Sequence, residues 1–302
     1  MIIESLLTGA VQSGTSVLLT VCGETVTERV GIINLGTEGC MAVGALSAYI
    51  VCANTGNPWL AVPVACIVGG LMALIHAYFV ISRKANQLAT GLTLMFLGLG
   101  LTAFFGRNYV SVSVIGFTRG KIPLLSDIPI IGDALFNQDP ITYLSYLICP
   151  LLCILIYKTR FGLILRGAGE DENVVFAYGH DPIKMRYIGV IMGGMLSALG
   201  GAQLSIAYTH TWIEGMTGSR GVIGVALVCI AAWNPAKAFI GAYIFGAAQA
   251  LQMMLQQQGL EISSFLLMMI PYVLVLIALF ITSIRRRQTM PAELKKVFES
   301  VT

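Results

Sequence analysis

Residues 58–82 read PWLAVPVACIVGGLMALIHAYFVIS and contain no Asp, Glu, Lys or Arg. A helix of about 20 apolar residues crosses the hydrocarbon core of a bilayer, so this run is long enough to span a membrane. Similar runs lie near residues 5–22, 37–53, 87–105, 141–157, 185–208, 219–233, 236–256 and 262–284. The sequence therefore predicts an all-α polytopic membrane protein with about nine spans. Runs 37–53 and 219–233 are short and rich in glycine, so we expect tilted, broken or re-entrant helices there.

The composition points to the same class. Of the 302 residues, 56% are hydrophobic and 11% are charged, whereas about 25% of the residues in a soluble domain are charged. The mean hydropathy is +0.81. These values exclude a soluble enzyme and predict one transmembrane domain over residues 1–302, surrounded by membrane lipid. The net charge of +3 gives no reason to expect a nucleic-acid partner. Because Met1-Ile2-Ile3-Glu4 lacks a basic stretch, we expect the first span rather than a cleavable signal.

The positions of Lys and Arg predict the orientation, because basic flanks stay on the cytoplasmic side. Most of the 18 basic residues fall in one alternate set of connections, which includes 158–186 and the tail 285–302. The other set includes the long connection 106–140 and holds few of them. We therefore expect the N-terminus outside, 106–140 as an outer loop, 158–186 as a cytoplasmic loop, and 285–302 as a cytoplasmic tail.

The dipeptide Asn-Pro occurs at Asn57 and again at Asn234, each time between a short glycine-rich run and a longer apolar one. Keeping the separation of the two dipeptides pairs Gly69 with Gly246. This indicates an internal repeat. The alternative is that small residues every fourth position are simply common on packed membrane helices.

If the repeat is real, residues 1–105 form a first half and residues 185–284 a second half, offset by an odd number of spans. An odd offset inverts the second copy, and the basic residues independently place Asn57 outside and Asn234 inside. Inverted halves are a recurrent transporter architecture with the path near their interface.

Small residues also predict close helix packing. Gly189, Gly193, Ser197 and Gly201 recur every fourth residue and so share one helical face, and Gly69 and Gly246 are candidates for the same role. We interpret all six as packing positions and not as ligand sites.

The loop 158–186 is the most charged stretch of the chain. Acidic residues at 170–172 suit the start of a helix, Gly179 suits its end, and Asp181 caps the next helix. We therefore predict a short surface helix over 171–178 whose apolar side chains form a docking surface for a soluble partner. The alternative is a linker helix that packs on the membrane face.

Few ionisable residues lie inside the spans, and Glu38 is the main one. It follows Asn34 in a glycine-flanked run where unwound backbone can line a path. Equally, Glu38 can lie at the cytoplasmic interface, paired with Arg29 or with backbone amides. The neutral side chains of Thr93, Gln203 and Gln249 are candidates for an uncharged polar route. Hydrogen bonding between helices is the alternative role for each.

On the outer side, Trp212, Glu214 and Arg220 lie between two predicted spans, where they can gate an entrance or meet a receptor. Anchoring of aromatic residues at the membrane interface is the alternative. The sequence contains no G-x-x-x-x-G-K-[ST] loop, no H-E-x-x-H and no G-x-S-x-G, and its histidines are far apart. We therefore expect no catalytic residues, no metal site and no ATP site in this chain.

Three motifs carry a resemblance to a known family. They are ERVGIINLGTEG at 28–39, the loop from GLILR at 162–166 to GHDP at 179–182, and RGVIGVA at 220–226 followed by WNP at 233–235. In this order they resemble permease subunits of ABC importers, in the group that serves branched-chain amino acids, ribose-type sugars and nucleosides. The pattern is most similar to nucleoside and simple-sugar permeases that work with basic-membrane-lipoprotein receptors, and the similarity covers nearly the whole chain.

The resemblance implies a fold like that of the cobalamin importer permease, although about nine spans depart from its ten. It implies that the helix in the 158–186 loop couples to an ABC ATPase subunit, which binds ATP and magnesium. The coupling candidates are then Arg166, Glu170, Asp171, Glu172, Val175, Tyr178, His180 and Asp181. It also implies a second permease subunit, a different chain in the nucleoside members, and an extracytoplasmic substrate-binding lipoprotein, all at the plasma membrane of a prokaryote.

The resulting hypothesis is a permease for a neutral, hydroxyl-rich solute, with nucleosides first and simple sugars such as ribose as the alternative. An ion-coupled secondary transporter is a second hypothesis, motivated by the inverted repeat and Glu38. An assembly subunit without a solute path is a third.

Overall fold

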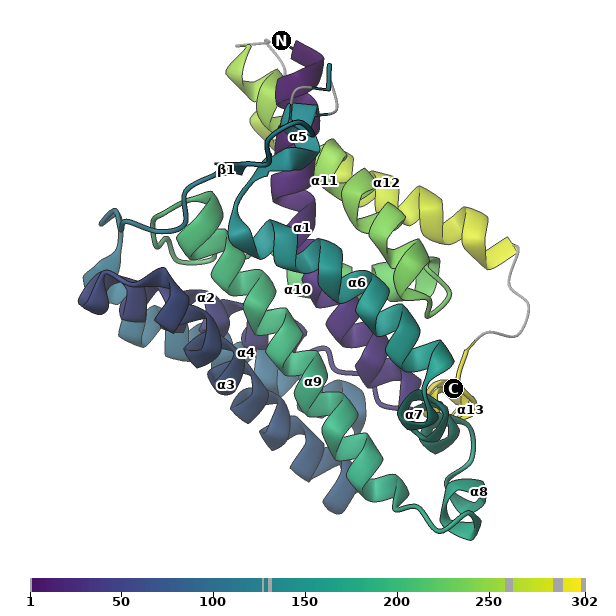
Figure 1. Cartoon of the computed structure of the whole chain (residues 1–302). Helices are drawn as coiled ribbons and strands as arrows, with labels where there is room; N and C mark the ends of the chain where they lie inside the picture. Colours follow the sequence, from purple (N-terminus) through teal and green to yellow (C-terminus); the bar gives the residue numbers. More distant parts are fainter. Residues whose placement is uncertain (1, 127, 130–131, 259–262, 285–289, 300–302) are drawn as a thin grey trace.

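The computed structural model describes residues 2–126, 128–129, 132–258, 263–284 and 290–299. In these ranges the chain is almost entirely helical, and Figure 1 shows α1 in the middle, with α2, α3 and α4 on one side and α11 and α12 on the other. The longer helices are α1 (Ile2–Arg29), α2 (Thr37–Thr55), α3 (Pro58–Ala77), α4 (Gln87–Gly106), α6 (Pro140–Lys158), α9 (Pro182–Ala202), α11 (Pro235–Gln257) and α12 (Ser264–Ile284). The shorter helices are α5 (Gly132–Phe136), α7 (Arg160–Glu170), α8 (Glu172–Ala177), α10 (Arg220–Ile230) and α13 (Ala292–Glu299). Short π-helical segments, η1 (Tyr78–Ser82) and η3 (Gln203–Tyr208), extend α3 and α9, and the 3-10 turn η2 (Arg107–Tyr109) extends α4.

Seven helical segments of the described chain are long and apolar enough to cross a membrane. They are Ile3–Arg29, Pro58–Ser82, Gln87–Tyr109, Pro140–Lys158, Pro182–Tyr208, Pro235–Gln257 and Ser264–Thr282. An all-α polytopic membrane protein is therefore confirmed.

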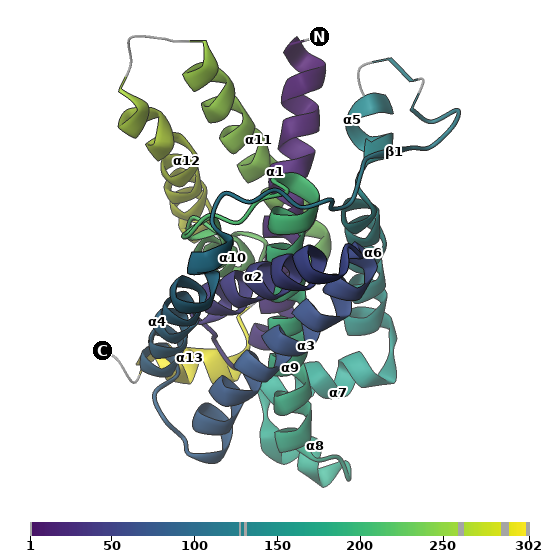
Figure 2. The same ribbon diagram turned by 90° about the vertical axis from the view of Figure 1, so that its left-hand side faces the viewer.

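The predicted number of nine spans is not confirmed, because the runs 37–53 and 219–233 fall outside this set. The second run forms α10, whose 11 residues extend only about 16 Å. The first run forms α2, whose side chains are largely buried against α3, α4 and α9. Figure 2 shows α2 lying across the direction of α1.

Helix α1 is the centre of the fold and packs against α9, α10 and α11. The sequence placed the end of this span at residue 22, but the helix continues to Arg29. The predicted end was too early because Glu24 and Glu28, which interrupt the apolar run, belong to the same helix. Both side chains are buried inside the protein instead of meeting water.

Two corners connect a short helix to a long one with the same Asn-Pro cap. Asn57 Oδ1 accepts a hydrogen bond from Trp59 N at 3.0 Å, and Asn234 Oδ1 accepts one from Ala236 N at 3.0 Å. In both cases proline occupies the first turn, where its missing N–H leaves no donor unsatisfied. Helices α3 and α11, which begin at these corners, run in opposite directions (Figure 2).

Glycines on α3 and α11 allow close approach to the central helices. A Cβ on Gly69 would meet the Cβ of Ala198 and come within 2.6 Å of Gly194 O, on α9. A Cβ on Gly246 would come within 2.6 Å of the Gly14 backbone, on α1. The α3–α9 and α1–α11 pairs therefore meet backbone to backbone.

On α9, the predicted ladder of small residues faces two helices. A Cβ on Gly189 would meet Val30, one on Gly193 would meet Thr27, and both of these residues belong to or follow α1. A Cβ on Gly201 would meet the Met41 carbonyl of α2. Ser197 is buried and donates to Gly193 O at 2.9 Å within its own helix.

The 106–140 connection is partly ordered as a two-stranded ladder, β1 (Gly120–Lys121) with β2 (Asn137–Gln138). It also pairs with the segment after η3, since Ser111 N donates to Trp212 O at 3.0 Å and Val114 N donates to His210 O at 2.9 Å. The ring of Trp59, at the Asn57 corner, lies 4.8 Å from that of Phe117. This end of the molecule therefore gathers the 106–140 connection, the Asn57 corner and the segment after η3.

Candidate coupling surface and solute path

Helix α8 presents a small apolar surface at the opposite end of the molecule from the 106–140 connection (Figure 1). The predicted helix 171–178 is observed as Glu172–Ala177. Asp171 Oδ1 caps it by accepting from Asn173 N at 2.9 Å, and Gly179, with φ +80°, ends it. Phe176 is 73% and Tyr178 80% exposed.

Other residues of the 158–186 loop pack against α8 and fix its position. Val175 is buried, and a Cβ on Gly167 of α7 would lie 2.9 Å from its methyl group. His180 is exposed, and its backbone N donates to Val175 O at 3.2 Å. Asp181 Oδ1 caps α9 by accepting from Ile183 N and Lys184 N. The packing of Val175 on α7 and the cap of α9 thus hold α8 in place, with its exposed side chains on one surface.

Arg186 of α9 joins α8 to the C-terminal helix α13. Its guanidinium lies 2.9 Å from Glu172 Oε2 and 3.6 Å from Glu293 Oε2. The C-terminal helix is also held by Glu170 Oε2, which accepts from Ala292 N at 3.2 Å. Lys296 Nζ donates to Glu293 Oε1 at 2.7 Å, which raises the pKa of Lys296. The tail predicted from its basic charge therefore includes an ordered helix packed on the loop.

Arg166 differs from its expected place on the surface of the loop. Its guanidinium lies over the Tyr157 ring of α6, 5.3 Å from the ring centroid, and its Nε is buried without a hydrogen-bond partner. The reason is that 160–170 forms helix α7, which the sequence analysis did not predict. In this helix Arg166 faces Tyr157 of α6.

Glu38 joins α2 to the start of α10. Its carboxylate accepts from the Thr217 hydroxyl at 2.6 Å, from Ser219 N at 3.0 Å and from Gly221 N at 2.6 Å. It thereby satisfies N–H groups at the start of α10, where Ser219 makes no side-chain cap. Of the partners considered for Glu38, the structure shows backbone amides and not Arg29.

Asn34 is buried in the turn between α1 and α2. Its backbone N donates to Glu24 Oε1 at 2.8 Å, and its side-chain Oδ1 accepts from Gly36 N at 2.9 Å. Its Nδ2 and the second carboxyl oxygen of Glu24 are buried without partners. Such unpaired buried groups are costly, so the turn is a place where a second arrangement or a polar ligand would be stabilised.

A polar stripe along α1 was missed by the sequence analysis. Every fourth residue is polar and buried from near the N-terminal end to the C-terminal end of the helix, namely Thr8, Gln12, Ser16, Thr20, Glu24 and Glu28. This spacing was visible in the sequence, since residues four apart lie on one face of a helix. The hydroxyls of Ser16 and Thr20 bond to carbonyls of their own helix.

The predicted route residues fall in different surroundings. Gln203, in the π-helical η3, is buried; its Nε2 donates to Gln12 O at 3.3 Å and its Oε1 has no partner. The Oε1 of Gln249 on α11 is also buried and unpaired. Thr93 is exposed on α4 and donates to Ala89 O of its own helix. Gln203 therefore lies beside the stripe of α1, whereas Thr93 faces outward.

The predicted outer residues are also separated. Trp212 is 2% exposed, and a Cβ on Gly106 would meet its indole ring. It differs from an accessible gate because it fills the space beside Tyr49 of α2. Glu214 is exposed. Arg220 is buried at the start of α10 with Nη1 unpaired, near enough to Glu38 and Tyr208 to interact electrostatically.

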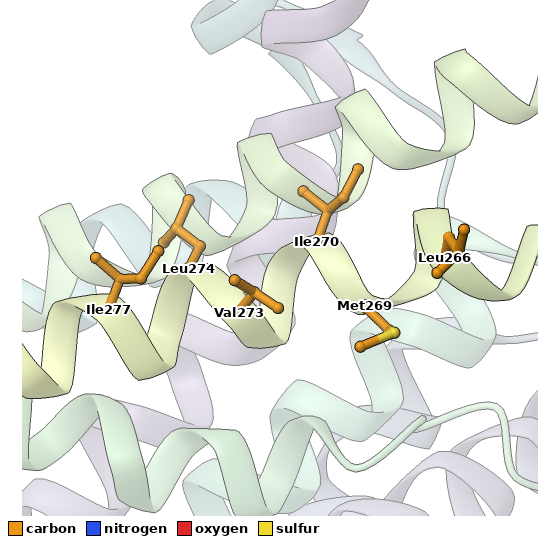
Figure 3. A pocket seen from close by; sticks show the side chains of 6 residues that line it. All are labelled: Leu266, Met269, Ile270, Val273, Leu274 and Ile277. Carbon is orange, nitrogen blue, oxygen red and sulfur yellow. The ribbon is translucent and has the colours of Figure 1, made fainter. Parts of the chain in front are cut away.

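One surface hollow on the described part of the chain does not suit a polar solute. It is lined by six side chains of α12, which Figure 3 shows in a row along that helix: Leu266, Met269, Ile270, Val273, Leu274 and Ile277. None of these side chains can replace the hydrogen bonds that a hydroxyl-rich molecule makes to water. Such a face suits lipid or another apolar helix.

A comparison with known proteins identifies the family to which the chain belongs. Residues 5–279 match the family described as branched-chain amino acid transport system / permease component. The chain belongs to this permease family. No solved structure matches it.

Several curated relatives are similar over most of their length. A putative glucose ABC transporter permease protein of Haloferax volcanii is 41% identical over 85% of this chain and 79% of its own. The guanosine ABC transporter permease protein NupQ of Bacillus subtilis is 33% identical over 87% and 86% of the two chains. The nucleoside ABC transporter permease protein NupC of Lactococcus lactis is 31% identical over 88% of each.

The family assignment has three consequences. The chain is a multi-pass membrane component of an ABC transporter and not an enzyme. Its family implies that it works with an ATPase and with a substrate-binding protein. It also favours energy from that ATPase over the ion-gradient hypothesis, which rested on the repeat and on Glu38.

Proposed function

We propose that this permease imports a neutral, hydroxyl-rich solute, with nucleosides as the first candidate. The observation that carries the proposal is the similarity to two nucleoside permeases, NupQ and NupC, over nearly the full length of each chain. The uncharged part of the α1 stripe, from Thr8 to Thr20, supports it. Hydroxyl and amide groups there can exchange their present bonds for bonds to a ribose or a base.

A simple sugar is the second candidate. The relative that is 41% identical is named as a putative glucose permease. Sugars and nucleosides share the dense hydroxyl groups that a polar, uncharged path recognises, so the α1 stripe serves either solute.

In this proposal the path lies between two inverted halves, 1–105 and 185–284, in a fold of the cobalamin-importer type with nine membrane-embedded helices. Supports are the identical Asn57 and Asn234 caps and the matched glycine contacts of α3 and α11. The side with the 106–140 connection faces outward together with the N-terminus. The side with α7, α8 and α13 faces the cytoplasm, as the basic residues favour.

Helix α8 is the coupling helix in this proposal. Its exposed Phe176 and Tyr178, rimmed by Glu172, form the kind of apolar patch that marks a protein contact. The partner there is the ABC ATPase subunit, which holds ATP and magnesium. On the outer side an extracytoplasmic lipoprotein delivers the solute, and a second, different permease chain completes the membrane part.

Uptake in the native cell tests the solute. Cells lacking this chain should lose ATP-dependent uptake of labelled guanosine or adenosine, and the restored chain should recover it. Loss of glucose or ribose uptake instead would favour the sugar alternative. Unchanged uptake of all four would contradict the proposal.

Substitutions on α8 test the coupling helix. Tyr178→Ala and Glu172→Gln should reduce the amount of ATPase that copurifies and the rate of uptake, while the permease still inserts. Ile115→Ala is the matched control, because Ile115 is 84% exposed in the 106–140 connection. Full copurification and uptake with both α8 variants would contradict the assignment.

A further inference from the structure

The corner between α10 and α11 has a backbone that non-glycine residues rarely adopt. Ala232 has φ +52° and Trp233 has φ +55°. The left-handed conformation is unfavourable for an L-residue because its Cβ crowds the following carbonyl oxygen. Two consecutive residues hold it here, and such strain persists only where the surroundings impose it.

The surroundings of Trp233 do impose it. Its carbonyl oxygen accepts three hydrogen bonds, from Arg29 Nε at 3.0 Å, Arg29 Nη2 at 2.9 Å and the Tyr157 hydroxyl at 3.1 Å. Its indole N–H donates to Glu28 Oε2 at 2.5 Å. Trp233 is 3% exposed. The corner is therefore clamped by the inner end of α1 and by α6.

The residues that hold Trp233 also contact α7, the helix that precedes α8. A Cβ on Gly169 of α7 would meet the carbonyl of Arg29, so these backbones are in direct contact. Arg166 of α7 lies over the Tyr157 ring at 5.3 Å, and Arg29 lies over the same ring at 5.7 Å. Helix α7 continues through Asp171 into α8. A displacement of α8 therefore reaches the two residues that hold the carbonyl of Trp233.

The corner also connects two helices of the membrane domain, α10 and α11. Glu38 holds the other end of α10, and α11 packs along α1. One carboxyl oxygen of Glu28 is buried without a partner while the other binds the indole. An unsatisfied acceptor at the clamp costs free energy in this arrangement and none in one that satisfies it.

We propose that Trp233 is a positioning residue that transmits movement of α8 to α10 and α11, and that the corner leaves its clamp when the path opens. The inference rests on the proposed role of α8 as the coupling helix. It adds a specific route, from α7 through Arg29 and Tyr157 to Trp233. The strained backbone favours release, and the four hydrogen bonds oppose it, so the corner suits a two-state element.

The test uses the purified complex of the full-length permease with its ATPase and partner subunits, in lipid vesicles. Trp233→Phe keeps an aromatic ring and removes the indole donor, and Glu28→Met removes the acceptor. Each should lower the number of solute molecules moved per ATP hydrolysed by about fivefold or more. Glu28→Gln retains an oxygen acceptor and should restore most of the ratio.

The matched control is Trp59→Phe, the same substitution beside the outer corner, where Trp59 is largely exposed. It should leave the ratio unchanged. A purely structural role of Trp233 predicts less folded complex with an unchanged ratio, and that result would overturn the proposal.

Fluorescence gives a second readout that does not depend on transport. The contribution of Trp233, obtained by subtracting the spectrum of Trp233→Phe, should shift to longer wavelength when the ATPase binds a non-hydrolysable ATP analogue. An unchanged contribution with the ATPase still docked would overturn the relay alone. Failure of the wild-type chain to bind an ATPase would instead overturn the proposed function.

Discussion

The Asn57 and Asn234 corners share a helix cap and differ in the residue before it. At the Asn57 corner Gly56 takes the left-handed conformation with φ +66°, and a Cβ placed there would have open space around it. At the Asn234 corner Trp233 takes the equivalent conformation and is buried. The backbone of the Asn57 corner is unstrained and its glycine has open space around it, whereas the backbone of the Asn234 corner is strained and held by hydrogen bonds.

The difference shows how one scaffold serves two tasks. The helices after the corners pack alike, with Gly69 against α9 and Gly246 against α1. Within the described residues, the Asn234 corner is connected to α7 through Arg29 and Tyr157. The packing positions are therefore shared, and the contacts toward the proposed coupling surface are found at one corner.

The largest expected effect comes from the shared packing positions. Gly69→Val and Gly246→Val should each lower the free energy of unfolding by about 3 kcal/mol, because the added carbons overlap neighbouring backbone. Thermal unfolding in detergent measures this. Gly100→Ala is the control, since a Cβ there meets nothing within 4 Å. If one valine variant were tolerated and the other not, the packing would not be equivalent.

Exchanging the left-handed residues should have opposite effects at the two corners. Gly56→Ala should cost about 1–2 kcal/mol of stability, because alanine resists a positive φ. Ala232→Gly relieves the same strain and should be neutral or stabilising. Melting temperatures of the two variants make the comparison. A destabilising Ala232→Gly would show that the Asn234 corner is not strained.

The shared caps should contribute alike. Asn57→Ala and Asn234→Ala each remove one hydrogen bond to a helix N-terminus, and each should cost about 1 kcal/mol. Unfolding of the two variants side by side provides the measurement. Substitution by Ser, which also caps helices, is the control. A difference of more than about 1 kcal/mol between the two alanine variants would break the equivalence.

The smallest effect concerns the ion pair between Arg186 and Glu293, which holds α13 against α9. Glu293→Gln weakens the contact of α13 with Arg186 and should cost less than about 1 kcal/mol, and less still at high salt. Asp133→Asn, which breaks an exposed pair with Lys121 in the 106–140 connection, should cost even less. A larger loss from Asp133→Asn would reverse the expected order.

Features that depend on local sequence could be predicted. Apolar runs, the Asn-Pro caps and the acidic start of α8 follow from residues adjacent in the chain. Features set by distant contacts could not. Nothing near Glu38 reveals that it caps α10, and nothing near Trp212 reveals that it fills a space beside Tyr49.

The C-terminal end of α1 was missed for a related reason. Glu24 and Glu28 resemble the end of a span when only hydropathy is counted. Their partners are Asn34, in the turn that follows α1, and Trp233, which is 205 residues from Glu28 along the chain. The fourfold spacing of polar residues from Thr8 onward was the available signal. Hydropathy alone discards that signal because it averages over the faces of a helix.

Accessibility of the two corners tests the central claim most directly. Asn54→Cys and Lys237→Cys place exposed thiols beside them, in a variant whose seven native cysteines have been replaced. A membrane-impermeant maleimide is then applied to right-side-out vesicles. The account predicts labelling of Asn54→Cys at once, and of Lys237→Cys only after the vesicles are opened. Labelling of both from outside would contradict two inverted halves.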